Sequence, residues 1–370
     1  MLIKKKEIAL LLIFLSLVVT NLFAENYYFK RYDKENGLSQ QTVFCAVQDR
    51  RGFLWFGTKV GLNRFDGTKF KNYVADPEQP NSLPNNTVLA LAEAPDGSLW
   101  LETSDGLCIY NPEKDTFAPF VSADLTIEGL IDNLVFDKQG NLWVINSKGI
   151  YCLDVKNGNH KFFSASDFFV PTGITVTQSG SVWVLGLDGN IYLFNPQRME
   201  FSFYPILTKE EKTKHILLYR ILECSNGDLV VTTDRIGARR FSPNNGEVKV
   251  LFSNDSQNNP IYIHTAIQRN KDEFWFGTES GIHIYQLDLG FIDHLQKSYN
   301  DAYSLSDNAV HMLLKDREEG IWVGTFFGGV NYLSNNNTLF DKYLPKDEKG
   351  SIKANVIREI HPDVEGNLWV

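Results

Sequence analysis

The chain alternates short apolar runs with polar turns, and one such unit recurs along its length. In the first unit an alternating run at 43–47 leads into a turn, Asp49 to Gly52, and then into the segment Leu54–Thr58. Apolar residues that alternate with others and are interrupted by Asp and Gly are typical of antiparallel hairpins. The pattern therefore predicts β-strands, because a helical repeat would show a period of 3.6 residues instead.

Tryptophan marks one position of this unit. Successive tryptophans are 45, 43, 40, 92, 47 and 47 residues apart, and Val230 lies within the gap of 92 in the same local pattern, which splits the gap into 47 and 45. The seven tryptophans are Trp55, Trp100, Trp143, Trp183, Trp275, Trp322 and Trp369. Their spacing indicates a structural repeat of roughly 45 residues.

Each unit continues with a glycine, a third strand that ends on an aromatic residue, and a fourth strand such as Phe70–Tyr73. The glycines are Gly61, Gly106, Gly149, Gly189, Gly281 and Gly328, six residues after a tryptophan, and Gly237, seven after Val230. Four short antiparallel strands per unit is the pattern of a propeller blade. The sequence predicts an all-β fold, a seven-bladed β-propeller of four-stranded antiparallel blades over residues 25–343, with the start of a further blade at residues 344–370.

The two ends of the ring leave alternatives open. The segment Phe29–Tyr32 copies the fourth-strand motif but precedes the first unit, so it completes either the seventh blade, in competition with Phe340–Tyr343, or a last blade that the chain lacks. An eighth unit begins at Val356 and stops inside its second strand at Val370. A strand cut there would leave its backbone hydrogen bonds unmade, so we expect the chain to be a fragment or a truncated reading frame.

The first 24 residues have the order of a Sec signal peptide. Lys4, Lys5 and Lys6 precede an apolar run at 8–19, and Ala24 follows before the polar Glu25. The run is shorter than the roughly 20 residues that a membrane-spanning helix needs, which favours cleavage over a retained anchor. We therefore expect the mature chain to begin near Glu25, outside the cytoplasm and in the periplasm.

Charge and cysteine usage exclude some functions. The formal net charge is −9, and no basic cluster follows the first few residues, so direct nucleic-acid binding is not expected. The four cysteines, Cys45, Cys108, Cys152 and Cys224, lie at different repeat phases. We expect buried small side chains rather than two disulfides, and no cofactor or metal site.

The segments Leu38–Ser39, Gly52–Thr58, Gly61–Gly67 and Phe70–Tyr73 resemble the two-component regulator propeller repeat, and the resemblance extends over about residues 27–370. That repeat is typical of periplasmic sensors in bacterial hybrid two-component systems. The resemblance implies a ligand-sensing module that recognises a glycan fragment or another small polar ligand. It also implies a parent receptor that is anchored in the inner membrane, can form a homodimer, and contains a histidine kinase encoded beyond this fragment.

Two other function classes stay open: a secreted propeller enzyme, either a polysaccharide lyase or a glycosidase, and a protein-binding scaffold. The seven histidines share no metal spacing. Asp49, Asp137 and Asp316 recur at the same turn, where aspartate is favoured because it accepts hydrogen bonds from local backbone amides. The sequence therefore predicts no catalytic residues in this chain.

The turn after the tryptophan strand differs from unit to unit, and this variable rim is the predicted ligand site. Its residues are Lys59, Asp105, Lys148, Asp188, Arg235, Glu279, Phe326 and Phe327. Mixed charge with two aromatic rings suits a sugar, which stacks on aromatic faces and hydrogen-bonds through its hydroxyls. The alternative is a solvated rim in which Phe326 and Phe327 pack under their neighbours.

Overall fold

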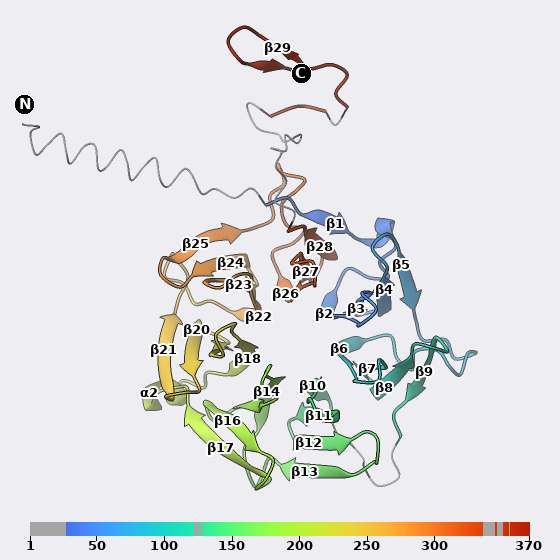
Figure 1. The fold of residues 1–370 in the computed structure, drawn as a ribbon, viewed down its shortest axis with the longest axis vertical. Helices are drawn as coiled ribbons and strands as arrows, with labels where there is room; N and C mark the ends of the chain where they lie inside the picture. The colour runs from blue at the N-terminus through green and yellow to red at the C-terminus, as the bar shows by residue number, and fades with distance from the viewer. Residues whose placement is uncertain are drawn as a thin grey trace, which may run out of the picture.

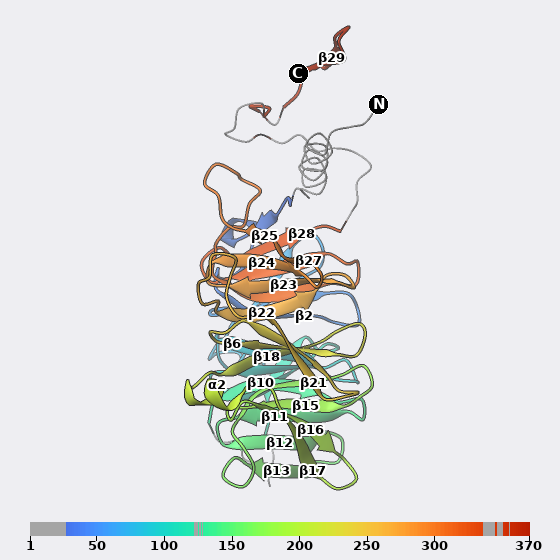
Figure 2. The same cartoon turned by 90° about the vertical axis from the view of Figure 1, so that its left-hand side faces the viewer.

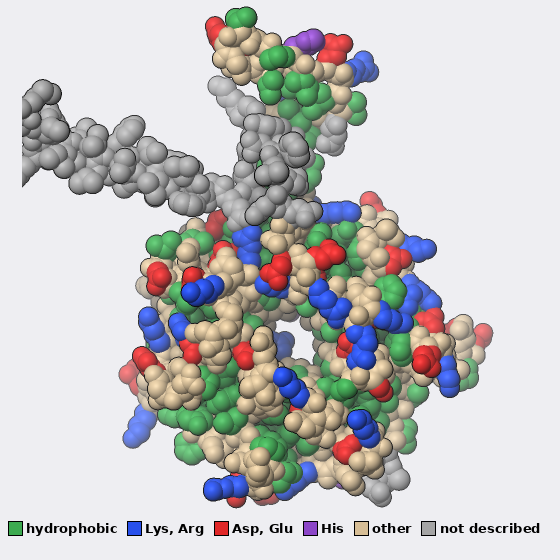
Figure 3. Space-filling view, viewed as in Figure 1, with side chains coloured by type: hydrophobic (Ala, Val, Ile, Leu, Met, Phe, Trp, Pro, Cys, Tyr) green, Lys and Arg blue, Asp and Glu red, His purple; other side chains and the backbone are tan. Residues whose placement is uncertain are grey.

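The computed structural model describes residues 27–121, 125, 127, 129–335, 345, 351–354 and 356–370. Seven four-stranded antiparallel sheets form a closed ring, which confirms the predicted fold class (Figure 1). Around the ring the innermost strands face a central opening that is visible in the space-filling view (Figure 3). The signal peptide predicted for residues 1–24 and the strand predicted at 340–343 lie outside the described residues.

Six blades run in chain order from an inner to an outer strand. Blade 1 contains β2 (Val43–Gln48), β3 (Leu54–Thr58), β4 (Gly61–Phe65) and β5 (Phe70–Tyr73). Blades 2 and 3 contain β6 (Val88–Glu93), β7 (Leu99–Thr103), β8 (Gly106–Asn111), β9 (Thr116–Pro119), β10 (Ile131–Phe136), β11 (Asn141–Asn146), β12 (Gly149–Asp154) and β13 (His160–Ser164). Blade 4 contains β14 (Pro171–Val176), β15 (Val182–Gly186), β16 (Asn190–Asn195) and β17 (Glu200–Pro205).

Blade 5 follows the short helix α2 (Lys209–Thr213) and contains β18 (Leu218–Glu223), β19 (Leu229–Thr233), β20 (Ala238–Ser242) and β21 (Glu247–Phe252). Blade 6 contains β22 (Ile263–Gln268), β23 (Glu273–Thr278), β24 (Gly281–Gln286) and β25 (Gly290–Leu295). Blade 7 contains β26 (Val310–Lys315), β27 (Ile321–Thr325) and β28 (Val330–Leu333), and its outer strand is β1 (Lys30–Tyr32) from the other end of the described chain.

The N-terminal strand therefore closes the ring in blade 7, which settles the alternative that the sequence left open. In the β1–β28 pair Lys30 lies opposite Tyr332 and Tyr32 lies opposite Val330. The ring of Tyr32 stacks on Trp322, with 5.7 Å between centroids, and meets Phe65 of blade 1 edge-on at 5.1 Å. Residues from the two ends of the ring thus share one blade and pack on the next.

The ring tryptophans pack between neighbouring blades. The six in the ring are 0–4% exposed. Trp55, for example, packs against Leu99, Leu101 and Tyr110 of blade 2. Its indole Nε1 donates to Asp49 Oδ2 at 2.9 Å, while Asp49 Oδ1 accepts from the backbone amides of the same turn. The turn aspartate thus has the structural role expected of it.

The turn after each second strand also repeats. Thr58 Oγ1 donates to the carbonyl of Gly61 at 2.8 Å, and Gly61 has a φ of +96°. Blades 5 and 7 have one more residue between the threonine and this glycine. The positive-φ glycine of blade 7 is therefore Gly329, with a φ of +77°, and the prediction of Gly328 for this position is wrong by one residue.

The C-terminal residues form a hairpin outside the ring (Figures 1 and 2). Its strands are β29 (His361–Pro362) and β30 (Leu368–Trp369). Trp369 Nε1 donates to Asp363 Oδ2 at 2.9 Å, the same contact that Trp55 makes with Asp49, but Trp369 is 68% exposed. The bounds of the eighth unit and of the ring domain stay predictions.

All four cysteines are free, as the repeat phases predicted. Cys108 and Cys224 are buried as expected, whereas Cys45 and Cys152 are half-buried. Burial raises the pKa of the Cys108 and Cys152 thiols to about 12, so both are protonated at neutral pH. In the described part of the chain no helix has both the length and the apolar character to cross a membrane.

Candidate functional site at the mouth of the channel

Every inner strand has a β-bulge near its first residue. In blade 1, Val43 lies opposite Thr58 and Cys45 lies opposite Gly57, so Phe44 is the extra residue. The same shift recurs in the other six blades. The extra residues, here called the channel-mouth ring, are Phe44, Leu89, Asp132, Thr172, Tyr219 with Arg220, His264 and His311.

A bulge re-aims the side chain of its extra residue. None of the channel-mouth residues is fully buried, although each belongs to the innermost strand of its blade. Each bulge lies opposite the end of the second strand, beside the turn that contains the predicted ligand residues. The channel-mouth ring and the predicted rim therefore share one face of the propeller, and together they form the candidate site.

Two histidines and a glutamate meet where blades 6 and 7 adjoin. Glu279 Oε1 lies 2.6 Å from His264 Nε2 and 3.6 Å from His311 Nε2. The two imidazoles are stacked, with 4.4 Å between centroids and 12° between planes. Phe326 lies against His311 with centroids 5.2 Å apart. Burial, and then the charge of the neighbouring His264, lower the pKa of His311, so this imidazole is neutral near pH 7.

This cluster was missed in the sequence, although a signal for it was present. His264 and His311 are 47 residues apart, the same separation as Trp275 and Trp322. Residues at one repeat phase lie at equivalent places on neighbouring blades. A search for metal-binding motifs compares residues that are a few positions apart in the sequence. It therefore misses His264 and His311, which lie in different blades.

A buried carboxyl group lies elsewhere in the mouth, between blades 2 and 3. Glu102 occupies the position of Gly57, where an added Cβ would lie 2.4 Å from Cys45 Sγ. Its cross-strand neighbour is the smaller Ala90. Glu102 is 2% exposed, and its Oε1 has no hydrogen-bond partner. Burial, with a smaller contribution from the charge of Asp132, raises the pKa of Glu102 to about 8. The group is therefore mostly protonated at neutral pH and can donate a hydrogen bond.

The predicted rim residues lie around this face but do not form one cluster. Glu279, Phe326 and Phe327 come together with the two histidines. Phe326 is half-buried and Phe327 is 69% exposed, so only the first packs under a neighbour. Lys59 and Lys148 are exposed in their turns.

The other three predicted residues make contacts within the protein. Asp188 accepts a hydrogen bond from the hydroxyl of Tyr192 at 2.6 Å. Arg235 donates to the carbonyl of His215 at 3.0 Å and pairs with Asp234. Asp105 accepts from the side-chain amide of Asn85 at 3.1 Å. These contacts orient the turns, and any role of these residues in binding stays a prediction.

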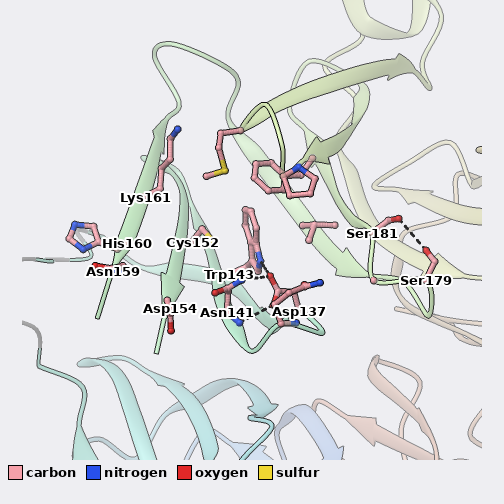
Figure 4. Close-up of a pocket in the computed structure, with 16 residues that line it drawn as sticks. Asp137, Asn141, Trp143, Cys152, Asp154, Asn159, His160, Lys161, Ser179 and Ser181 are labelled. Atoms are coloured by element: carbon pink, nitrogen blue, oxygen red, sulfur yellow. Dashed lines mark hydrogen bonds between the residues drawn. The ribbon is translucent and has the colours of Figure 1, made fainter. Parts of the chain in front are cut away.

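A concavity lies between blades 3 and 4, beside the turns that join the first strand of each blade to the second (Figure 4). It has a volume of about 620 Å³ and opens next to Asp137 and Ser179. Trp143 and Met199 supply apolar surface, and Lys161 supplies a cation. Trp143 Nε1 is already bonded to Asp137 at 2.8 Å, so the polar end of this indole has its structural partner.

The fold and these contacts define the class of the protein: a seven-bladed β-propeller in which buried tryptophans and other apolar side chains pack between neighbouring blades. Residues 37–59 and 304–327 match the family described as the two-component regulator propeller. The two segments contain the first two strands of blades 1 and 7, so the match covers parts of two blades of the ring.

Comparison with known proteins agrees with this. A stretch of 58 residues, 16% of this chain and 4% of the relative, is 47% identical to histidine kinase P4 of Formosa agariphila. The extracellular domain of a hybrid two component system from B. thetaiotaomicron is 25% identical, with a TM-score of 0.72. That match covers 93% of this chain and 46% of the other, so the chain spans less than half of that domain.

Enzymes share the same architecture. Virginiamycin B lyase from Staphylococcus aureus is 12% identical over 84% of this chain and 99% of its own, with a TM-score of 0.64. At that identity the likeness concerns the fold alone. The propeller is therefore common to sensors and to lyases, and function has to be argued from the site.

Proposed function

We propose that this propeller is a periplasmic ligand-sensing domain of a hybrid two-component receptor, and that it recognises a small polar ligand, a glycan fragment, at the mouth of its channel. The similarity to the extracellular domain of a hybrid system supports the sensor role. The glycan is the ligand class that the chemistry of the mouth fits best.

One observation carries the proposal. The strands and turns of the ring repeat, yet the channel-mouth ring changes around the propeller: Phe44 and Leu89 in blades 1 and 2, Asp132 in blade 3, Thr172 in blade 4, Tyr219 with Arg220 in blade 5, and a histidine in each of blades 6 and 7. Structural positions repeat because the fold requires them, whereas differing positions on one face can match an asymmetric ligand. Aromatic faces with convergent hydrogen-bonding groups are the usual surroundings of a sugar.

Contacts at the mouth also link neighbouring blades. Arg220 Nε of blade 5 donates to the carbonyl of His264 in blade 6 at 3.1 Å. Thr42 Oγ1 of blade 1 donates to the carbonyl of Phe326 in blade 7 at 2.7 Å. A ligand that contacts several blades would favour the arrangement of the blades in which it binds best, and so change which of these hydrogen bonds form. We propose that this change is passed to a kinase elsewhere in the receptor.

Binding is tested by calorimetry of the purified chain against a panel of glycan fragments. Asp132→Asn and Tyr219→Ala should each weaken binding by about 1–3 kcal/mol, the size of one charged hydrogen bond or one aromatic contact. Lys161→Ala, in the concavity of Figure 4, is the matched control and should leave affinity unchanged. If Lys161→Ala weakened binding while Asp132→Asn and Tyr219→Ala left it unchanged, the ligand would bind in that concavity and the proposal would be contradicted.

A further inference from the structure

We propose that His264, Glu279 and His311 form a binding site for one divalent transition-metal ion, of which zinc is the best match, that bridges blades 6 and 7. The inference goes beyond the proposed function, and its test requires no glycan. It rests on the geometry of three side chains that the fold brings together from β22, from the turn after β23 and from β26.

The donor set has the composition that zinc prefers. Each residue offers one ligand atom, and the three atoms lie within 4.8 Å of one another. Two imidazole nitrogens and one carboxylate oxygen around zinc, with bonds of about 2.0–2.2 Å, is a common three-ligand set. Tetrahedral bonds of that length place donors about 3.3 Å apart. The separations of 2.6 and 3.6 Å from Glu279 Oε1 bracket this value. The two imidazole planes are only 12° apart, so one ring has to rotate about its Cβ–Cγ bond for both Nε2 lone pairs to point at one ion.

The charges nearby also permit a cation. Glu279 and Asp307 place negative charge beside His311, and the guanidinium of Arg220 places positive charge there. Because both histidines belong to the channel-mouth ring and neither is fully buried, a fourth coordination position toward the channel would remain open to water or to an oxygen ligand.

A second stacked histidine pair in blade 6 shows what a non-binding arrangement looks like. His283 and His294 stack with 3.8 Å between centroids. His283 Nε2 contacts Ser280 Oγ at 3.1 Å, and His294 Nε2 contacts the carbonyl of Ser280 at 2.8 Å. Both Nε2 atoms already contact Ser280, so this pair is an internal control.

The experiment is a titration of the purified, untagged chain, stripped with chelator, with zinc chloride and separately with magnesium chloride. Calorimetry should give one zinc per chain with micromolar or tighter affinity and a melting temperature that rises with zinc. Magnesium should not bind, because it prefers an all-oxygen octahedral shell. His264→Ala and His311→Ala should weaken zinc binding by at least about 100-fold, since even outer-shell partners of a metal contribute 10–100-fold.

The exposed Glu279→Gln change keeps the proposal testable if a histidine variant folds poorly, and it should also weaken zinc binding. His294→Ala should retain the affinity of the parent chain. Absence of a saturable zinc site in the parent, equal binding by parent and Glu279→Gln, or equal binding of magnesium would each overturn the proposal.

Discussion

At the scale of single residues, the hydrogen bond between a turn aspartate and a tryptophan indole is the smallest feature that the ring repeats. It joins Asp49 to Trp55, Asp137 to Trp143 and Asp316 to Trp322. Blade 5 has Val230 at the tryptophan position and Cys224 at the turn-aspartate position. In blades 1, 3 and 7 the carboxylate accepts hydrogen bonds from an indole and from the amides of its own turn, which gives these acids a structural role.

We expect Asp49→Ala to lower the free energy of unfolding by about 2–4 kcal/mol, because it leaves the buried indole N–H of Trp55 and two turn amides without their acceptor. Asp363→Ala removes the equivalent bonds from the exposed hairpin outside the ring and is the matched control. Urea unfolding should show a large change for the first variant and almost none for the second. Equal effects would contradict the structural role of the ring aspartates.

The raised pKa of Glu102 makes stability depend on pH. The unfolded chain releases this proton near the ordinary pKa of 4.5, whereas the folded chain holds it to about 8. The stability that Glu102 contributes is therefore fully present below pH 4.5 and is lost as pH rises toward 8, at up to about 1.4 kcal/mol per pH unit.

Glu102→Gln should flatten this part of the pH profile, because the glutamine does not ionise. Urea unfolding at pH 5 and pH 8.5 measures the difference. Asp132→Asn should make the loss of stability smaller and end it at a lower pH, since the charge of Asp132 raises the pKa of Glu102 in the folded chain. An unchanged profile in Glu102→Gln would show that the carboxyl ionises as it does in water.

At the scale of elements, the strands could be predicted and the bulges could not. Tryptophan, glycine and alternating apolar residues recur because each strand and turn must meet the same neighbours in every blade. A bulge adds one residue whose side chain faces the open channel, where the fold imposes no residue type. The channel-mouth ring therefore has no residue type common to the seven blades. His264 and His311 recur at the repeat spacing, and the other positions become visible only through the strand register.

The same reasoning explains the outcome for the candidate residues. The turns that hold Glu279 and Phe326 were predicted because they vary, but their partners His264 and His311 lie on inner strands that look ordinary. The motif at Phe29–Tyr32 predicted an outer strand. Its blade could not be predicted, because that depends on how many units close the ring.

The seam at β1 gives a prediction at this scale. Tyr32 is 7% exposed and contacts both Trp322 and Phe65, so Tyr32→Ala should lower the free energy of unfolding by about 3–5 kcal/mol, as large aromatic deletions do. Phe203→Ala, on the outer strand β17 and 63% exposed, is the control and should change it by less than about 1 kcal/mol. Similar melting temperatures for the two variants would contradict closure of the ring by β1.

At the scale of the whole molecule, the residues that stabilise the propeller and the residues proposed to bind a ligand lie in different places. Buried aromatic residues pack between neighbouring blades, and in blades 1, 3 and 7 a turn aspartate fixes the tryptophan of its own blade. The channel mouth carries the differences between blades, and it gathers carboxyl, imidazole, guanidinium and aromatic groups on one face. This asymmetry on a repeating frame is the reason for proposing that the mouth binds a ligand.

The most direct test of that claim is calorimetry of the purified chain against plant, host and microbial glycan fragments, followed by chromatography of the recovered ligand. The account predicts saturable binding of at least one fragment, weakened by Asp132→Asn and Tyr219→Ala but not by Lys161→Ala, with the ligand recovered unchanged. Recovery of cleaved or eliminated sugar would contradict the sensor and favour an enzyme. Absence of binding to every fragment, with a protein partner that co-purifies, would contradict it in favour of a scaffold.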